Sequence, residues 1–402
     1  MANNQLLLFG KTDFNKVNGV SGFKVGRFWV GGFVLNDYSC GMNDFGLLLT
    51  EWYEKNRRML PWRETGDAYA IWLSEVILQQ TRVNQGMPYY QRFIEKYPTI
   101  DKLAAASKDE VFKLWQGLGY YRRAENMMKA ARVIVNKHES IFPDNYHNLL
   151  KLPGIGDYTA AAIASIAYGE KVPVVDGNVY RVLSRIFGIE TVIQTSKAKK
   201  EFGHLMRSLM KQFHPGTFNE AVMEFGALQC VPANPDCSSC IFNKQCFAYS
   251  LNKVQKLPVV KPKVKKRTLF IYYLVTEWEG QIVLRHRRKN EIWKGLYDFP
   301  SLEFDKKQTE DTLLREIEHV SFLKQESIKI ISPGHKIFKH LLTHINITAQ
   351  FIQVSVEKKP DVAGLSALQL VQYKELSSYP VSRLVERFLE DAVDVFSVRS
   401  SG

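Results

Sequence analysis

The acidic residue Glu75 lies in an unusually apolar stretch, Ile-Trp-Leu-Ser-Glu-Val-Ile-Leu, at positions 71–78. Burying a carboxylate is costly unless it is paired, so an isolated residue of this kind is most often salt-bridged or at the surface. An apolar environment also raises the affinity of a carboxyl group for a proton, which a general acid requires near neutral pH. Glu75 is therefore a candidate for acid–base chemistry.

Four of the five cysteines are clustered, with six, two and five residues between successive members. They are Cys230, Cys237, Cys240 and Cys246. Four thiolates suit either zinc or a [4Fe–4S] cluster. Structural zinc sites often use two Cys-x-x-Cys pairs, and only Cys237 and Cys240 form one. The clustering argues against a disulfide scaffold, and Cys40, which has no partner nearby, is expected to be a bystander.

A tight turn, Leu-Pro-Gly-Ile-Gly at 152–156, separates two helical patterns. Proline and glycine cannot continue a helix there, so the segment predicts a helix–hairpin–helix whose second helix begins with free N–H groups suited to a phosphate. A Gly-x-Gly turn alone is often a plain connector. Here Asp176, which follows two valines and precedes Gly177, lies twenty residues after Gly156, and the combination is more specific.

Two other junctions combine aromatic and basic residues. Trp62 and Arg63 follow Pro61, and Tyr120 lies between the glycines and the arginines of segment 115–124. Taken alone, the first would be a packed corner and the second a helix junction with a core tyrosine.

The composition narrows the class of protein. A chain of 402 residues with 45% hydrophobic residues predicts two or three domains with real cores. The formal net charge of +13 favours a polyanionic partner. Phe28 to Leu35 is apolar but too short to span a membrane, and it lacks the basic start of a signal peptide.

Changes of pattern set the expected domain boundaries. Residues 1–41 show no sustained period and are expected to be a disordered extension, arising from a translation start placed too far upstream. Residues 42–250 carry helical patterns, including an amphipathic helix over 43–56. Residues 251–267 are lysine-rich with two prolines, which predicts a linker that is a solvated tether, a contact for a polyanionic backbone, or both.

The second half is expected to be α+β. Within 268–392, strands are predicted at 269–275, 281–285 and 345–356, and a helix near 309–319. Residues 393–402 are expected to be a tail.

The hairpin and Asp176 together resemble the helix–hairpin–helix DNA glycosylase superfamily, and residues 45–389 resemble its adenine DNA glycosylase (MutY) branch. This resemblance implies a mainly α-helical glycosylase domain with a [4Fe–4S] cluster loop, followed by an α+β Nudix-like domain. It also implies that the four clustered cysteines hold the cluster. Val231 to Asp236 carries no Lys or Arg, whereas this loop is usually basic.

The resemblance also implies roles for the catalytic residues. By this resemblance, Glu75 is the acid that protonates adenine. Asp176 faces the sugar, with Tyr158 and Asn178 beside it. Endonuclease III, a lyase relative, has lysine at the position of Tyr158, and a tyrosine cannot form its Schiff base.

Further residues are implied to contact the DNA. Adenine contacts are expected from Trp62, Arg63, Leu78 and Glu220. Gln80 and Tyr120 are expected to enter the duplex beside the opposing base, and Gly154 and Gly156 to bind the DNA backbone.

The Nudix-like part departs from a working hydrolase, because Arg315-Glu316-Ile317-Glu318 is followed by His319 and Val320 rather than by a carboxylate pair. The family instead reads oxidised guanine with a Phe-Ser-His loop, which aligns with Leu342, Thr343 and His344. Thr343 and His344 keep the polar groups, and Leu342 loses the aromatic contact.

The sequence therefore predicts an enzyme that hydrolyses the glycosidic bond of adenine opposite 8-oxoguanine or guanine in double-stranded DNA. It is expected to be a monomer, without a membrane segment, in the cytoplasm of a bacterial cell. A glycosylase/lyase of the endonuclease III type is opposed by Tyr158 and by the second domain. A silent DNA-binding or electron-transfer module is opposed by the presence of both Glu75 and Asp176, and a nucleotide pyrophosphatase by the broken Nudix motif.

Overall fold

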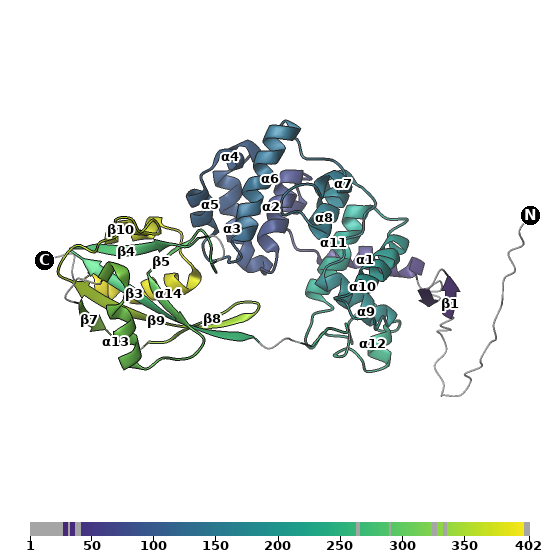
Figure 1. Ribbon diagram of the computed structural model, residues 1–402. Coiled ribbons are helices and arrows are strands. Elements are labelled where there is room, and N and C mark those ends of the chain that lie inside the picture. Colours follow the sequence, from purple (N-terminus) through teal and green to yellow (C-terminus); the bar gives the residue numbers. More distant parts are fainter. Residues whose placement is uncertain are drawn as a thin grey trace, which may run out of the picture.

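The structure is a computed structural model of the chain. It describes residues 27–30, 33–36, 42–262, 266–288, 291–323, 328–332 and 336–397. A helical domain and a sheet domain lie side by side and are joined by a linker (Figure 1). Within the described residues, no helix has the length and apolar character needed to cross a membrane.

The helical domain begins with α1 (Met42–Asn56), which matches the predicted amphipathic helix. The other helices are η1 (Pro61–Arg63), α2 (Ala68–Leu78), α3 (Val83–Lys96), α4 (Ile100–Ala105), α5 (Lys108–Trp115), α6 (Arg122–His138), α7 (Tyr146–Leu149), α8 (Asp157–Tyr168), α9 (Gly177–Phe187), α10 (Ser196–Leu209), α11 (Pro215–Leu228) and α12 (Phe247–Ser250). Several begin at a polar side chain that accepts from the first turn, as Asp67 does for α2 and Asp176 for α9.

The described part of the helical domain has two large hydrophobic cores and a small cluster of Ala161, Ala162 and Val174. One lies among α2 to α8 and includes Trp72 and Trp115. The other joins α1 to α9, α10 and α11 and includes Phe45 and Phe225. Helix α8 packs against both α2 and α11. Close approach is possible because a Cβ on Gly216 of α11 would lie 2.8 Å from the carbonyl oxygen of Ser165. The cores thereby bring α2, α8, α9 and α11 together.

The second domain is built on a mixed sheet with the order β10-β4-β3-β9-β7, with β5, β6 and β8 at its margins. Its strands are β3 (Arg267–Trp278), β4 (Gln281–His286), β5 (Tyr297–Asp298), β6 (Ser301–Phe304), β7 (Ile328–Ser332), β8 (Phe338–Leu341), β9 (Ile345–Val356) and β10 (Leu368–Gln372). The central pair, β3 and β9, is parallel, and the other pairs are antiparallel. The remaining elements are α13 (Glu310–Glu318), η2 (Ser321–Leu323), η3 (Tyr373–Ser378) and α14 (Arg383–Ser397). The predicted strands and helix are confirmed.

Alternation along β3 explains why both faces of the sheet are covered. Ile271 and Tyr273 enter the core shared with α14, while Tyr272 and Leu274 enter the core shared with α13. Because both faces of β3 are buried, its sequence is a nearly continuous apolar run.

The two domains are docked by buried and polar contacts. Leu296 of the sheet domain is 1% exposed and belongs to the first helical core. Gln116 Nε2 donates to Glu386 Oε1 at 2.8 Å, and the Tyr121 hydroxyl donates to the carbonyl oxygen of Val381 at 3.3 Å. These contacts hold the sheet domain against the helical domain.

Three segments differ from the sequence predictions. A hairpin of β1 (Arg27–Val30) and β2 (Phe33–Asn36) stands where a disordered extension was expected; the other residues of 1–41, Cys40 among them, lie outside the described residues. The start of the linker is bonded to the helical domain rather than free, because Arg185 donates to the carbonyl oxygens of Val254 and Leu257. Helix α14 continues to Ser397, past the expected domain end at 392.

Candidate active site

Glu75 lies on α2, three residues before its end, in a half-buried position. Burial raises the pKa of its carboxyl group to about 7. Asp176 and Glu220 raise the pKa further through their charges, while a hydrogen bond from Tyr158 and the charge of Arg63 oppose the rise. Near neutral pH this group can therefore hold a proton and release it.

Asp176 lies at the N-terminus of α9 and caps it. Its Oδ1 accepts from the backbone N–H of Val179 at 2.8 Å, and its Oδ2 accepts from Asn178 Nδ2 at 2.7 Å. Burial raises the pKa of Asp176, and these hydrogen bonds oppose the rise by stabilising the charged form. The helix dipole acts in the same direction.

Tyr158 is the second residue of α8 and reaches the same region. Its hydroxyl donates to Met223 Sδ at 3.6 Å, and burial raises its pKa well above the ordinary value, so it stays neutral. Asn178 in turn accepts from Arg181 Nη2 at 2.8 Å, which fixes its amide group beside Asp176.

Of the residues predicted to contact adenine, Arg63 and Glu220 pair with each other, whereas Trp62 and Leu78 pack against apolar neighbours. Arg63, with a side chain 8% exposed, lies between two carboxylates of α11: its Nε is 3.3 Å from Glu220 Oε1, and its Nη2 is 3.0 Å from Glu224 Oε2. Trp62 is buried in the first core and packs edge to face on Tyr90. Leu78 is half-buried at the end of α2.

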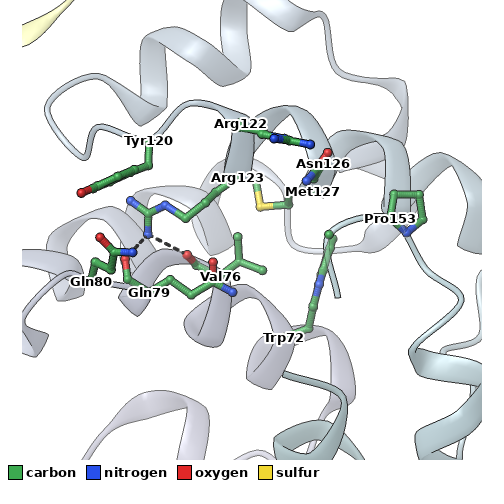
Figure 2. A pocket seen from close by; sticks show the side chains of 11 residues that line it. Trp72, Val76, Gln79, Gln80, Tyr120, Arg122, Arg123, Asn126, Met127 and Pro153 are labelled. Carbon is green, nitrogen blue, oxygen red and sulfur yellow. Dashed lines mark hydrogen bonds between the residues drawn. The ribbon is translucent and has the colours of Figure 1, made fainter. Parts of the chain in front are cut away.

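The predicted DNA-facing residues Gln80, Tyr120 and Gly154 line one hollow. Figure 2 shows Arg123 between the end of α2 and Tyr120. Its guanidinium donates to the carbonyl oxygens of Val76, Ile77 and Gln79 and, on the other side, to those of Leu118 and Gly119. One side chain thereby ties together the two loops that carry Gln80 and Tyr120.

The backbone at this hollow is strained. Gln80 and Tyr120 have φ of 59° and 50°, a left-handed conformation that costs on the order of 1–3 kcal/mol for residues other than glycine. Gly154 has φ of 76°, and a Cβ there would lie 2.5 Å from the Cβ of Asn126. Glycine is therefore required at 154, while Gly156 is exposed and directly precedes α8 as its N-cap.

Thr343 and His344 lie in the turn between β8 and β9, and both are exposed. Thr343 Oγ1 is 3.2 Å from the Tyr120 hydroxyl. The structure thus assembles two groups: Glu75, Tyr158, Asp176, Glu220 and Arg63 in the helical domain, and a second group made of Gln80, Tyr120 and Thr343 where the domains meet.

The four clustered cysteines line one cavity beside α9 and α11. None of them forms a disulfide. Burial, together with the other thiols, raises the pKa of Cys240 to about 12, so four thiolates would need a cationic centre. Arg185 Nη1 lies 3.5 Å from Cys230 Sγ, and the Phe242 N–H donates to Cys240 Sγ at 3.4 Å. The donor set fits a metal centre, although within the described part of the chain no three His, Cys, Asp or Glu side chains form a preassembled metal site.

Three residues that organise the site were missed in the sequence. Glu224 follows Glu220 by one helical turn, a spacing that could have identified it. Arg123 is one of two adjacent arginines in the segment 115–124, and nothing in the sequence distinguishes it from Arg122. Asn219 is fully buried, accepts from the Val174 N–H at 3.0 Å and so fixes the irregular segment that leads to Asp176. Its position directly before Glu220 gave no signal of this role.

Comparisons with known proteins agree with the geometry. The family described as "HhH-GPD superfamily base excision DNA repair protein" matches residues 73–208, and a NUDIX domain matches residues 271–391. An adenine DNA glycosylase of Buchnera aphidicola (subsp. Acyrthosiphon pisum) is 36% identical over 309 residues, which cover 75% of this chain and 85% of that protein. The mouse adenine DNA glycosylase is 31% identical over 393 residues, covering 84% of this chain and 76% of its own.

A solved thermostable thymine-DNA glycosylase is 31% identical, with a TM-score of 0.49, and the match covers 52% of this chain and 97% of that one. On the strength of the two sequence relatives, which match over most of their own length, the chain belongs to the adenine DNA glycosylase family of base-excision repair enzymes.

Proposed function

We propose that this DNA glycosylase hydrolyses the glycosidic bond of adenine paired with 8-oxoguanine or guanine in double-stranded DNA. The observation that carries the proposal is a half-buried carboxyl group, Glu75, whose pKa is raised to about 7, close to a capped second carboxylate, Asp176. Two carboxyl groups held in different protonation states can divide the work of glycoside hydrolysis.

Glu75 is the general acid. It protonates N7 of an adenine that has been flipped out of the duplex, which makes the base a better leaving group. Asp176 acts in its ionised form, which the hydrogen bonds from Val179 and Asn178 stabilise. Its charge stabilises the positive charge that develops on the sugar, and water then completes the reaction.

Tyr158 supports a reaction without strand cleavage. Its neutral hydroxyl interacts with Glu75, and it supplies no amine that could attack the sugar. The enzyme is therefore a monofunctional hydrolase rather than a lyase.

The base and the opposing strand are recognised by separate groups. Trp62, Arg63, Leu78 and Glu220 bind the adenine. Gln80 and Tyr120 enter the duplex, Thr343 and His344 contact the opposing base, and the N–H groups near Gly154 and Gly156 bind a backbone phosphate. Support comes from the shared hollow at Gln80, Tyr120 and Gly154 and from the position of Thr343 beside Tyr120.

We also propose that Cys230, Cys237, Cys240 and Cys246 hold a [4Fe–4S] cluster. The convergence of the four thiols on one cavity supports this assignment. A bound cluster would supply the positive centre that four thiolates need, and the protein would order the loop 230–246 around it. The enzyme is proposed to act on chromosomal DNA as a monomer in the cytoplasm of a bacterial cell.

Glu75→Gln tests the proposed function, because glutamine keeps the shape of the side chain and cannot donate the proton. The variant should bind a duplex with a single adenine opposite 8-oxoguanine and release almost no adenine under single-turnover conditions, scored as alkali-labile breaks. Glu51→Gln, a change at an exposed glutamate of α1, is the matched control and should act as the parent does. Near-normal cleavage by Glu75→Gln would reject the assignment.

A further inference from the structure

Glu224 is a buried carboxylate of α11 that binds two arginines at once. Its side chain is 1% exposed. It accepts from Arg58 Nε at 2.8 Å and Nη2 at 2.6 Å, from the backbone N–H of Arg58 at 2.9 Å, and from Arg63 Nη2 at 3.0 Å. The two arginines flank the short segment that carries Trp62.

The network continues toward the site. Arg63 Nε is 3.3 Å from Glu220 Oε1, and the Tyr53 hydroxyl donates to Glu220 Oε2 at 3.1 Å. Arg58 and Arg63 thus face two carboxylates, and these four formal charges cancel. Arg57, whose charge also acts on Glu220, is itself paired with Glu64 at 3.8 Å. The pKa of Glu224 is lowered to about 2, with its burial outweighed by hydrogen bonds from Arg58 and Arg63, so it is charged at every working pH.

The charges that act on Glu75 come from each element around it. Tyr158 of α8 and Arg63 of η1 favour its ionisation, whereas Asp176 ahead of α9 and Glu220 of α11 disfavour it. Arg63 is the one cation in this set, and its Nη2 donates to the carboxylate of Glu224. How strongly Arg63 favours loss of the proton from Glu75 therefore depends on Glu224.

We propose that Glu224 is a positioning residue that fixes Arg63 on α11 and neutralises its charge, so that Glu75 keeps its proton up to neutral pH. The inference rests on the proposed role of Glu75 as general acid. The contrasting possibility is a purely structural link between segment 58–63 and α11, which would not affect the proton affinity of Glu75.

The test is the pH dependence of single-turnover adenine release. The rate falls as pH rises through the pKa of the acid, so the midpoint of this fall measures the proton affinity of Glu75. Glu224→Gln leaves one arginine charge uncompensated and should move the midpoint down by about one pH unit, the low end of the effect of a neighbouring opposite charge. Arg58→Gln leaves one negative charge in excess and should move it up.

The double variant Glu224→Gln/Arg58→Gln restores the charge balance and should return the midpoint toward that of the parent. Asp298→Asn is the matched control, because Asp298 is also a buried carboxylate between two arginines, Arg285 and Arg287, but lies in the sheet domain. It should lower the melting temperature and leave the midpoint unchanged.

Opposite shifts in the two single variants would support the proposal. A lower plateau rate with an unmoved midpoint in both would overturn it and leave the structural link. Arg58→Gln breaks the same network from its more exposed side, so it still decides the question if Glu224→Gln does not fold. An active Glu75→Gln would instead reject the proposed function, whereas an inactive Glu75→Gln with unmoved midpoints rejects this inference alone.

Discussion

The Tyr120 hydroxyl lies 3.2 Å from Thr343 Oγ1, and this contact joins the helical domain to the sheet domain. The two residues come from motifs that are 223 positions apart. Both are exposed, so their hydrogen bond exchanges readily with water and contributes about 1 kcal/mol at most. The buried Leu296 and the bond between Gln116 and Glu386 hold the domains together instead. The contact between Tyr120 and Thr343 can therefore open at low cost while the domains stay docked.

Replacing both Thr343 and His344 by alanine should weaken the preference for adenine opposite 8-oxoguanine over adenine opposite guanine. The lost discrimination should be on the order of 1–3 kcal/mol, the usual scale for base-edge contacts. Leu342 already lacks an aromatic ring, so the effect should lie at the low end. The measurement is the ratio of single-turnover rates and affinities on the two duplexes.

Thr343→Ser is the control for this loop because it keeps the hydroxyl near Tyr120, and it should retain the preference. An unchanged ratio in the double alanine variant would move the reading of the lesion to the helical domain, around Gln80 and Tyr120.

Local chemistry made much of the architecture predictable. Amphipathic spacing identified α1, and alternation identified β3, β4 and β9. Gly154 of the hairpin was identifiable because the tight turn needs a conformation that only glycine adopts easily. Asp176 was found from its spacing to the hairpin, and its capping of α9 explains why it precedes a helix.

Long-range pairing could not be read from the sequence. Arg63 was expected to contact adenine, but its pairing with Glu224 joins residues 161 positions apart. Arg123 bonds carbonyl oxygens of two separate loops, and backbone acceptors leave no trace in residue types. The lysines, two prolines and few apolar residues of 251–267 predict a linker, yet Arg185 binds the backbone at its start.

The purified protein should be yellow-brown and contain about four iron atoms per chain, as a cluster held by four cysteines implies. Cys240→Ser should lower the iron content and the melting temperature. Cys40→Ser, at the cysteine outside the spaced set, should change neither. Elemental analysis that finds stoichiometric zinc and no iron would reject the cluster.

Borohydride should trap little or no covalent enzyme–DNA complex during turnover, because Tyr158 cannot form a Schiff base. The readout is a shifted band on a denaturing gel, with an endonuclease III-type lyase as the positive control. Efficient trapping that disappears when one particular lysine of this chain is replaced would show that the enzyme is a lyase.

Glu75→Gln should make the folded protein more stable, and the gain should depend on pH. The pKa of Glu75 is about 7 in the folded state against 4.5 for an ordinary glutamate, so the native state binds this proton more tightly than the unfolded state does. The stabilising contribution of protonated Glu75 is complete below pH 4.5 and is lost as pH rises to 7. Glutamine does not ionise, so the variant should match the parent at pH 4.5 and exceed it by up to about 3 kcal/mol at pH 8.

Denaturant unfolding at the two pH values measures this difference. Glu224→Gln provides a control of opposite sign, because the pKa of Glu224 is lowered to about 2. Its charged form stabilises the fold above pH 4.5 and loses that effect as pH falls toward 2, so this variant should be less stable than the parent at pH 8. Equal unfolding free energies for Glu75→Gln and the parent at pH 8 would mean that Glu75 ionises without cost. Its carboxyl group would then lack the raised proton affinity that a general acid needs at neutral pH.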